Sequence, residues 1–181
     1  MPSPATAPQP FVIEEYVRWS DVDFAGIIFY GSYVRLFEIA ETEMFRHCGL
    51  AYARMFDEYD IFLPRKAVHS EFYWPARLDD RLRIAAYVGK VGTKSLTLHF
   101  DVLRADAAAL GAAGWMVLVC VDRKKLKPLP LPSARLSGLA VTRSGSCPPA
   151  AITRTTQERH VQAAASLPIW KRNSSSGTGC W

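Results

Sequence analysis

Apolar and polar residues alternate along four segments of the chain, which is the pattern of β-strands with one buried face. The four segments are residues 11–19, 68–74, 82–88 and 96–102. A fifth segment, Trp115–Val121, is apolar throughout, as is typical of a central strand that is covered on both faces. The last four strands are joined by short connections at 75–80, 90–93 and 105–114. Because connections of this length join antiparallel neighbours, we predict that these four strands form a meander.

One long helix is predicted between the first strand and the other four. Its apolar positions follow the helical period and share one face: Tyr33, Leu36, Phe37, Ala40 and Met44. The helix is expected to end at Gly49, and residues 51–56 are compatible with a short second helix. The sheet is the only surface available to bury the apolar face of the long helix. The pattern therefore predicts an α+β fold in which an antiparallel five-stranded sheet wraps around one central helix.

Composition divides the chain into three parts. Residues 1–10 are rich in Pro and Ala and are expected to form a flexible arm, whereas residues 11–133 contain the predicted domain. Residues 134–181 are rich in small residues and lack any regular period, so we expect a basic, disordered tail. The net charge of +5 belongs to this tail, since the first 133 residues contain 16 basic and 16 acidic residues. The domain therefore has no excess of positive charge with which to bind nucleic acid.

Nothing in the sequence predicts export or a metal centre. No apolar run approaches the ~20 residues that span a bilayer, and we expect no secretory signal at the N-terminus. The four Cys residues have no close spacing, and we expect them to be reduced thiols of a cytoplasmic protein. The four His residues are scattered singly, so no metal site is expected.

The candidate chemistry lies in the segment before the long helix. Asp21 and Asp23 stand in the sequence SDVDFAG, directly before the helix. On one interpretation they form the turn, because Asp side chains readily accept hydrogen bonds from nearby amides. On the other, the unpaired N–H groups and partial positive charge of the helix N-terminus form an oxyanion hole. A carboxylate beside that hole could attack a carbonyl carbon or activate water.

Residues 21–33, DVDFAGIIFYGSY, resemble the D-x-D-x-x-G signature of the 4-hydroxybenzoyl-CoA thioesterase family, whose fold is the hotdog fold. Further segments resemble the same family in order: YVRLFEIAETEMFRHCG, EFYWPARLDDRLRI, KVGTKSLTLHFDVLR and VLVCVDRKKLKPLPLP. Together these segments are most similar to the bacterial acyl-CoA thioesterases associated with the Tol-Pal system of the cell envelope. The resemblance covers roughly residues 11–132. It implies an α+β hotdog domain that hydrolyses acyl-CoA thioesters to free acid and CoA.

The resemblance also implies roles for five residues of this chain. Asp23 matches the catalytic carboxylate of the family, and Tyr30 matches the residue whose backbone N–H polarises the thioester carbonyl. Gly26 matches the glycine that lets the loop approach the substrate, and Gly31 of the same signature is expected to bind substrate with it. Lys94 matches a basic residue that meets the nucleotide end of CoA. No metal ion or redox cofactor is implied.

The expected partners are acyl-CoA and further copies of the chain. A homodimer or homotetramer is expected, because one helix covers only one face of the sheet and the opposite face is also partly apolar. In the resembling enzymes the active site lies between two subunits. The basic run at residues 123–127 is either simply solvated or attracts anionic CoA or a membrane surface, which would give peripheral association with the inner membrane.

Other functions are compatible with parts of the sequence. A non-catalytic acyl-CoA-binding protein, acting as sensor or scaffold partner, would keep the same pocket. A hotdog dehydratase would need a catalytic His on the loop, and this loop has none. Another class of hotdog thioesterase uses a helix glutamate, for which Glu38 and Glu43 are the candidates. Their positions are more typical of an exposed or interface face of the helix.

Overall fold

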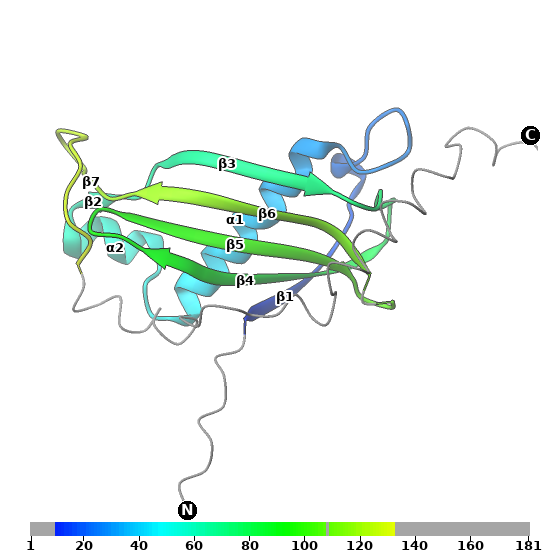
Figure 1. Cartoon of the computed structure of the whole chain (residues 1–181), viewed down its shortest axis with the longest axis horizontal. Coiled ribbons are helices and arrows are strands. Elements are labelled where there is room, and N and C mark those ends of the chain that lie inside the picture. The colour runs from blue at the N-terminus through cyan, green and yellow to red at the C-terminus, as the bar shows by residue number, and fades with distance from the viewer. Residues whose placement is uncertain (1–9, 108, 133–181) are drawn as a thin grey trace, which may run out of the picture. The chain divides into compact units, whose positions relative to one another are not determined.

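The computed structural model describes residues 10–107 and 109–132, and the predictions for residues 1–9 and 134–181 lie outside the described residues. The elements follow in chain order as β1 (Phe11–Tyr16), the 3-10 turn η1 (Trp19–Asp21), α1 (Tyr30–His47), α2 (Tyr52–Tyr59), β2 (Ile61–Phe62), β3 (Arg65–Phe72), β4 (Arg81–Val91), β5 (Ser95–Arg104), β6 (Leu110–Val119) and β7 (Val121–Asp122) (Figure 1). The predicted second helix is present and extends to Tyr59. The first predicted strand ends earlier than expected, because the chain turns into η1 after Tyr16.

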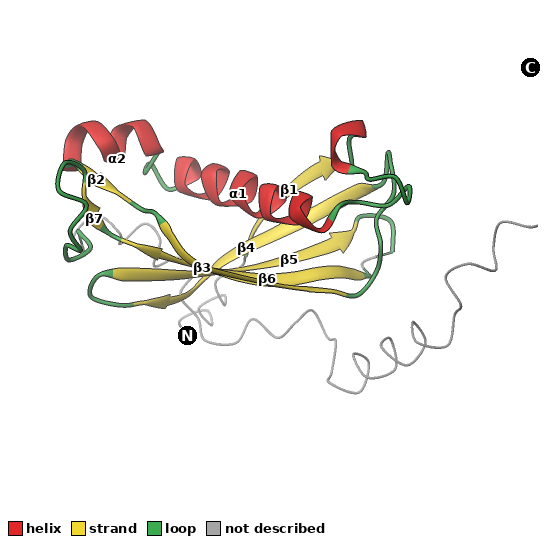
Figure 2. Ribbon diagram, turned by 90° about the horizontal axis from the view of Figure 1, so that it is seen from above, coloured by secondary structure: helices red, strands yellow, loops and turns green. Residues whose placement is uncertain are grey.

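The strands form one antiparallel sheet of five in the order β1-β4-β5-β6-β3. The short strands β2 and β7 pair separately. Helix α1 lies along one face of the large sheet, as Figure 2 shows from above. The predicted α+β architecture, five antiparallel strands around one central helix, is confirmed.

The predicted meander is wrong for β3, which pairs with β6 at the far edge of the sheet. The place beside β4 is taken by β1, whose Phe11–Tyr16 pair with Ala86–Arg81. Residues 73–80 are therefore not a hairpin, and they cross the end of the sheet from the edge strand β3 to β4, which lies next to the other edge. There the Ala76 carbonyl accepts a hydrogen bond of 2.8 Å from the N–H of Ile28, so this crossing supports the loop that precedes α1.

Strand β6 begins at Leu110, inside the Ala/Gly-rich stretch that we expected to be a connection. The small residues of this stretch make room for a side chain of α1. The Phe37 ring stacks on Phe100 with 4.8 Å between ring centroids, and it lies directly over Gly114. A Cβ atom at Gly114 would come within 2.6 Å of the Phe37 ring and 2.5 Å of the His69 carbonyl. Phe37 is fully buried in this arrangement, which is the centre of the core.

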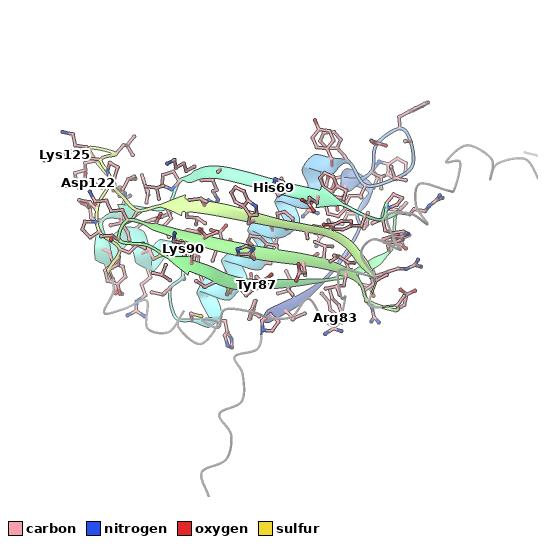
Figure 3. All side chains as sticks on the ribbon, in the orientation of Figure 1. His69, Arg83, Tyr87, Lys90, Asp122 and Lys125 are labelled. Carbon is pink, nitrogen blue, oxygen red and sulfur yellow. The ribbon has the colours of Figure 1, made fainter. Side chains whose placement is uncertain are left out.

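The face of the sheet away from α1 carries a row of aromatic and imidazole side chains. The strand register places Tyr87, His99, Trp115 and His69 side by side on four neighbouring strands. The Tyr87 ring stacks on His99 and the His69 ring stacks on Trp115, with 5.4 Å between centroids in each pair. Figure 3 shows His69 and Tyr87 on this face. The row is only half-covered within one chain, and we call it the outer aromatic row.

The contact between Phe37 and Gly114 predicts the effect of a single methyl group. Gly114→Ala should lower the free energy of unfolding by roughly 1–3 kcal/mol, because neither the ring nor the strand backbone can move away without loosening the core. Urea denaturation would measure the change. Ala113→Ser, one residue away with its side chain on the opposite face, is the matched control and should have little effect. Equal stability of Gly114→Ala and the wild type would contradict this account of the core.

Candidate active site

The loop between η1 and α1 is a closed turn that carries Asp23. Its two ends meet at an antiparallel bridge between Val22 and Ile28. Within the turn, the N–H of Asp23 donates to the Ile27 carbonyl at 3.0 Å, and the N–H of Gly26 donates to the Asp23 carbonyl at 2.9 Å. Gly26 has a φ of +71°, a left-handed conformation that glycine adopts without steric cost. The turn needs glycine at this position for that reason.

The Asp23 carboxylate is partly engaged in the turn and partly available. Its Oδ1 accepts a hydrogen bond of 2.8 Å from the N–H of Ala25. Among the described residues, Oδ2 has no donor, and the residue is exposed to solvent. The two interpretations of the sequence are therefore compatible, because one oxygen forms the turn while the other faces outward. The hydrogen bond also restricts the side chain to one orientation.

Helix α1 begins beside this loop with unpaired donors. Its N-cap is Phe29, which has no side-chain acceptor to cap the helix. Among the described residues the N–H groups of Tyr30 and Gly31 have no acceptor, whereas that of Ser32 donates to the Phe29 carbonyl at 2.9 Å. The Phe29 ring lies over Gly31, where a Cβ atom would collide with it. The Tyr30 and Gly31 amides therefore form a compact donor site that carries the positive end of the helix dipole.

Aromatic side chains surround the Asp23 loop and the start of α1. Phe24 is fully exposed, Trp19 and Tyr30 are largely exposed, and Phe29 is partly exposed. The rings of Phe29 and Tyr30 are in contact, with 4.3 Å between centroids. An exposed apolar group of this size beside polar donors is typical of a surface that receives a ligand or a second protein chain.

The loop is joined to α1 through Asp21, the first carboxylate of the motif, to which the resemblance assigned no role. Its carboxylate accepts three hydrogen bonds of 2.6–3.0 Å from Nε and Nη2 of Arg35, in the second turn of α1. A further bond of 2.9 Å comes from the N–H of Arg18. The Asp21 carbonyl accepts bonds from the N–H of Phe29 and the hydroxyl of Ser32. Asp21 is only 1% exposed.

The structure brings together four of the five predicted site residues. Asp23, Gly26, Tyr30 and Gly31 all lie in the loop or in the first turn of α1. Lys94 lies in the turn after β4, whereas the Asp23 loop lies at the end where β4 begins (Figure 1). The eleven residues of β4 span about 33 Å, so one chain cannot place Lys94 beside Asp23.

The helix glutamates that the sequence suggested are not part of this site. Glu38 accepts a hydrogen bond from Thr42, and Glu43 pairs with Arg46, both on the exposed side of α1. The buried glutamate of α1 is Glu41, which the sequence analysis did not single out. It accepts hydrogen bonds from the Tyr52 hydroxyl and, at 2.9 Å, from Nη2 of Arg65. This cluster ties α1 to α2 and to the start of β3.

No other part of the described chain offers comparable chemistry. No group of three or more His, Cys, Asp or Glu side chains lies close enough to hold a metal ion in residues 10–107 and 109–132. Burial raises the pKa of the Cys48 thiol, which disfavours the thiolate that a nucleophile would need. Burial also lowers the pKa of His99 on the outer face of the sheet.

Comparison with known proteins identifies the family of the chain. The model of the thioesterase-like superfamily matches residues 17–139, which include the loop, α1 and the whole described sheet except β1. The chain belongs to the thioesterase-like superfamily. The resemblance inferred from the motif and its following segments is thereby confirmed.

The relatives of the chain in this superfamily include named thioesterases. It is 36% identical over 118 residues to the acyl-CoA thioester hydrolase YbgC of Escherichia coli O6:H1, covering 65% of this chain and 87% of that protein. It is 26% identical over 116 residues to the acyl-CoA thioesterase YbgC of Haemophilus influenzae, covering 64% of this chain and 84% of that protein. The crystal structure of the 1,4-dihydroxy-2-naphthoyl-CoA thioesterase of Synechocystis matches with a TM-score of 0.67 and 22% identity, covering 72% of this chain and 95% of that one. The predicted hotdog fold is confirmed.

The Glu41 cluster predicts how stability depends on pH. Burial raises the pKa of Glu41 above its ordinary value of 4.5, and this outweighs the hydrogen bonds from Tyr52 and Arg65, which lower it. The folded protein thus holds this proton more tightly than the unfolded chain. The resulting stabilisation is complete below pH 4.5 and is lost as the pH rises through the folded pKa.

Glu41→Gln removes this titration, so the variant should gain stability relative to the wild type as the pH rises from about 4 to about 8. Urea denaturation at several pH values would measure the difference in the free energy of unfolding. Glu38→Gln, an exposed glutamate on the same helix, controls for the loss of a carboxylate. If the difference in the free energy of unfolding between Glu41→Gln and the wild type stays constant over this pH range, Glu41 does not have a raised pKa in the folded protein.

Proposed function

We propose that this protein hydrolyses acyl-CoA thioesters to a free carboxylic acid and CoA. The observation that carries the proposal is the pair of unpaired amides at Tyr30 and Gly31, which directly follow the closed loop that carries the exposed carboxylate of Asp23. Membership of the thioesterase-like superfamily and the similarity to the YbgC hydrolases support the same reaction. No observation favours the non-catalytic alternative.

In the proposed reaction the thioester oxygen accepts hydrogen bonds from the Tyr30 and Gly31 amides. These amides and the helix dipole stabilise the negative charge that develops on that oxygen in the transition state. Because the donors are backbone groups at the start of a packed helix, they need no rearrangement as the charge develops. Gly31 serves this site by allowing the Phe29 ring to lie against the first turn, and Gly26 serves it through the shape of the loop.

Two routes are compatible with the position of Asp23. In the first, an Asp23 oxygen bonds to the carbonyl carbon, the C–S bond breaks and CoA leaves as a thiolate that takes up a proton. Water then hydrolyses the mixed anhydride. In the second route, Asp23 accepts a proton from water, whose oxygen attacks the same carbon. The C–S bond then breaks, and CoA again leaves as a thiolate that takes up a proton. Neither route requires a metal ion or a redox cofactor.

We propose further that the active enzyme is a homodimer or a homotetramer with each site between two subunits. Strand β3 is an edge strand whose Val68 and Phe72 are exposed, and the buried Ser70 hydroxyl beside them has no hydrogen-bond partner among the described residues. Antiparallel pairing of two β3 strands would reverse the second sheet. The Lys94 end of the partner would then lie alongside the Asp23 end of the first chain. The outer aromatic row offers a further surface for a tetramer.

For the location of the protein we propose the cytoplasm, with contact to the inner membrane through the turn at residues 122–127. None of the helices in the described part of the chain is long and apolar enough to cross a membrane. In the turn, the Asp122 carboxylate accepts hydrogen bonds from the N–H groups of Lys124 and Lys125, and Leu126 projects into solvent beside them. Lysines that flank an exposed leucine suit an anionic lipid surface. Figure 3 shows Asp122 and Lys125 at one end of the sheet.

Replacement of the proposed catalytic carboxylate tests the reaction. Asp23→Asn should reduce kcat by a factor on the order of 10²–10⁴, because the amide is neither a base nor a nucleophile. The fold should persist, since the amide oxygen can still accept the hydrogen bond from Ala25. Turnover of a panel of acyl-CoAs with a thiol-reactive dye would measure the effect.

Asp57→Asn, an exposed carboxylate of α2, is the matched control and should keep full activity. Turnover by Asp23→Asn at the wild-type rate would show that Asp23 is not the catalytic carboxylate. A wild-type protein that binds acyl-CoA without any turnover would favour the sensor or scaffold function.

The two edge strands offer a matched test of assembly. Val68 on β3 is 44% exposed and Val12 on β1 is 39% exposed. A charged side chain at either position should therefore have a similar, small effect on the stability of a single chain. Val68→Glu should shift the mass measured by light scattering toward the monomer mass of 20.2 kDa and abolish turnover, because like charges would meet at the β3 contact. Val12→Glu should leave mass and turnover unchanged. A fully active wild-type monomer would refute the proposal.

A further inference from the structure

The position of Asp23 relative to the amide donors depends on two different parts of the chain. Asp23 belongs to the loop, whose internal hydrogen bonds fix its shape but do not attach it to the helix. The Tyr30 and Gly31 amides belong to α1, which is held by its apolar face against the sheet. Catalysis by the proposed site requires the carboxylate and the donors to keep a set geometry, and a displacement of about 1 Å can cost a factor of 10² in rate.

The contacts that join the loop to the helix converge on Asp21. Its carbonyl accepts the N–H of Phe29, the residue before the helix, at 2.7 Å and the Ser32 hydroxyl at 3.2 Å. Its carboxylate accepts hydrogen bonds from Arg35 in the second turn, whose Nη2 donates to Oδ1 at 2.6 Å and to Oδ2 at 2.7 Å. Asp21 thus has contacts to three successive points along the start of α1, and Asp23 follows it by only two residues.

The ion pair between Asp21 and Arg35 differs from a surface ion pair in its burial and in its number of hydrogen bonds. The Asp21 side chain is almost completely buried, and four hydrogen bonds satisfy it, three from Arg35 and one from the N–H of Arg18. A bidentate guanidinium fixes both distance and direction, which an ammonium group cannot do. Removing either partner would leave the other with unsatisfied polar atoms in a partly buried place.

We propose that Asp21 and Arg35 are positioning residues for the thioester reaction, which hold the Asp23 carboxylate at a set distance from the Tyr30 and Gly31 amides. Neither side chain has a hydrogen bond to Asp23 or to these amides, so they act through the loop backbone. The effect on catalysis rests on the proposed function. The link between Arg35 and the loop rests only on the hydrogen bonds described above.

The first experiment separates positioning from substrate binding. Arg35→Met and Asp21→Asn should each lower kcat about 10- to 100-fold with KM changed less than about twofold, since the substrate contacts remain while the reacting groups lose alignment. Arg35→Lys should recover only part of kcat, because lysine restores the charge but not the bidentate geometry. The double variant should be no slower than the slower single variant, since both act as one unit.

The control is Arg46→Met, which removes an exposed ion pair from the last turn of the same helix and should leave kcat unchanged. If Arg35 were only structural, Arg35→Met would melt at a lower temperature while the folded enzyme kept the wild-type kcat. That result, or a loss confined to KM, would overturn the proposal. Arg35→Lys keeps the test valid if the other variants fail to fold.

A second experiment needs no catalytic activity. Hydrogen–deuterium exchange of Arg35→Lys should show faster exchange in residues 22–29 than the wild type, with unchanged protection in β4 and β5. Unchanged exchange of the loop would overturn the proposed link whatever the enzyme does. If the exchange result holds but the wild type hydrolyses no acyl-CoA, the proposed function fails while the link between Arg35 and the loop stands.

Discussion

The burial of one helix face against one sheet face is the constraint from which the rest of this structure follows. Phe37 of α1 reaches the sheet over Gly114, where β6 has no side chain in its way, and stacks on Phe100 of the next strand. This contact leaves α1 little freedom to slide or rotate. The position of the helix start is therefore determined by packing in the core, several residues away from any chemistry.

A rigid helix start is useful only when the residues that approach it are equally well placed. The crossing segment between β3 and β4 supports the loop from one side through the Ala76 carbonyl. Asp21 attaches it to α1 from the other side, and the turn around Gly26 closes it. The loop is exposed, but the contacts that hold it in place come from the end of the sheet and from the helix. Backbone donors at Tyr30 and Gly31 can remain unpaired there because solvent reaches them.

Local patterns in the sequence predicted the helices and strands well, and the pairing of the strands less well. Alternation located β1, β4 and β5, and the apolar period located α1, because both signals depend on which side of each element is buried. The placement of β3 beside β6 could not be read from these signals, since connection lengths do not say which edge of the sheet is already occupied. The start of β6 was missed because Gly111 and Gly114 look like loop residues. Their place in a strand is explained only by the tertiary neighbours that they admit, Trp74 at Gly111 and Phe37 at Gly114.

The candidate site shows the same division. The loop motif and its resemblance to a known signature identified Asp23, Gly26, Tyr30 and Gly31, all within ten residues of one another. Arg35 was only a polar residue off the apolar face of the helix, because its role depends on meeting Asp21 fourteen positions earlier. Glu41 was missed for a related reason. Its burial is explained by the hydrogen bonds from Tyr52 and Arg65, which come from other elements.

Apart from the bonds to the Asp21 and Asp23 carboxylates, the hydrogen bonds that shape the Asp23 loop use main-chain acceptors: the carbonyls of Asp21, Asp23, Ile27 and Ala76. Main-chain acceptors are present whatever the side chains are. The exposed rings of Phe24, Phe29 and Tyr30 contribute no hydrogen bond to this framework, although they belong to the loop and to the start of α1. In the proposed enzyme, such a site can diverge toward new acyl groups by exchanging these exposed rings while the Asp23 carboxylate and the amide donors keep their places. Specificity and reactivity are thus free to evolve almost independently in this scaffold.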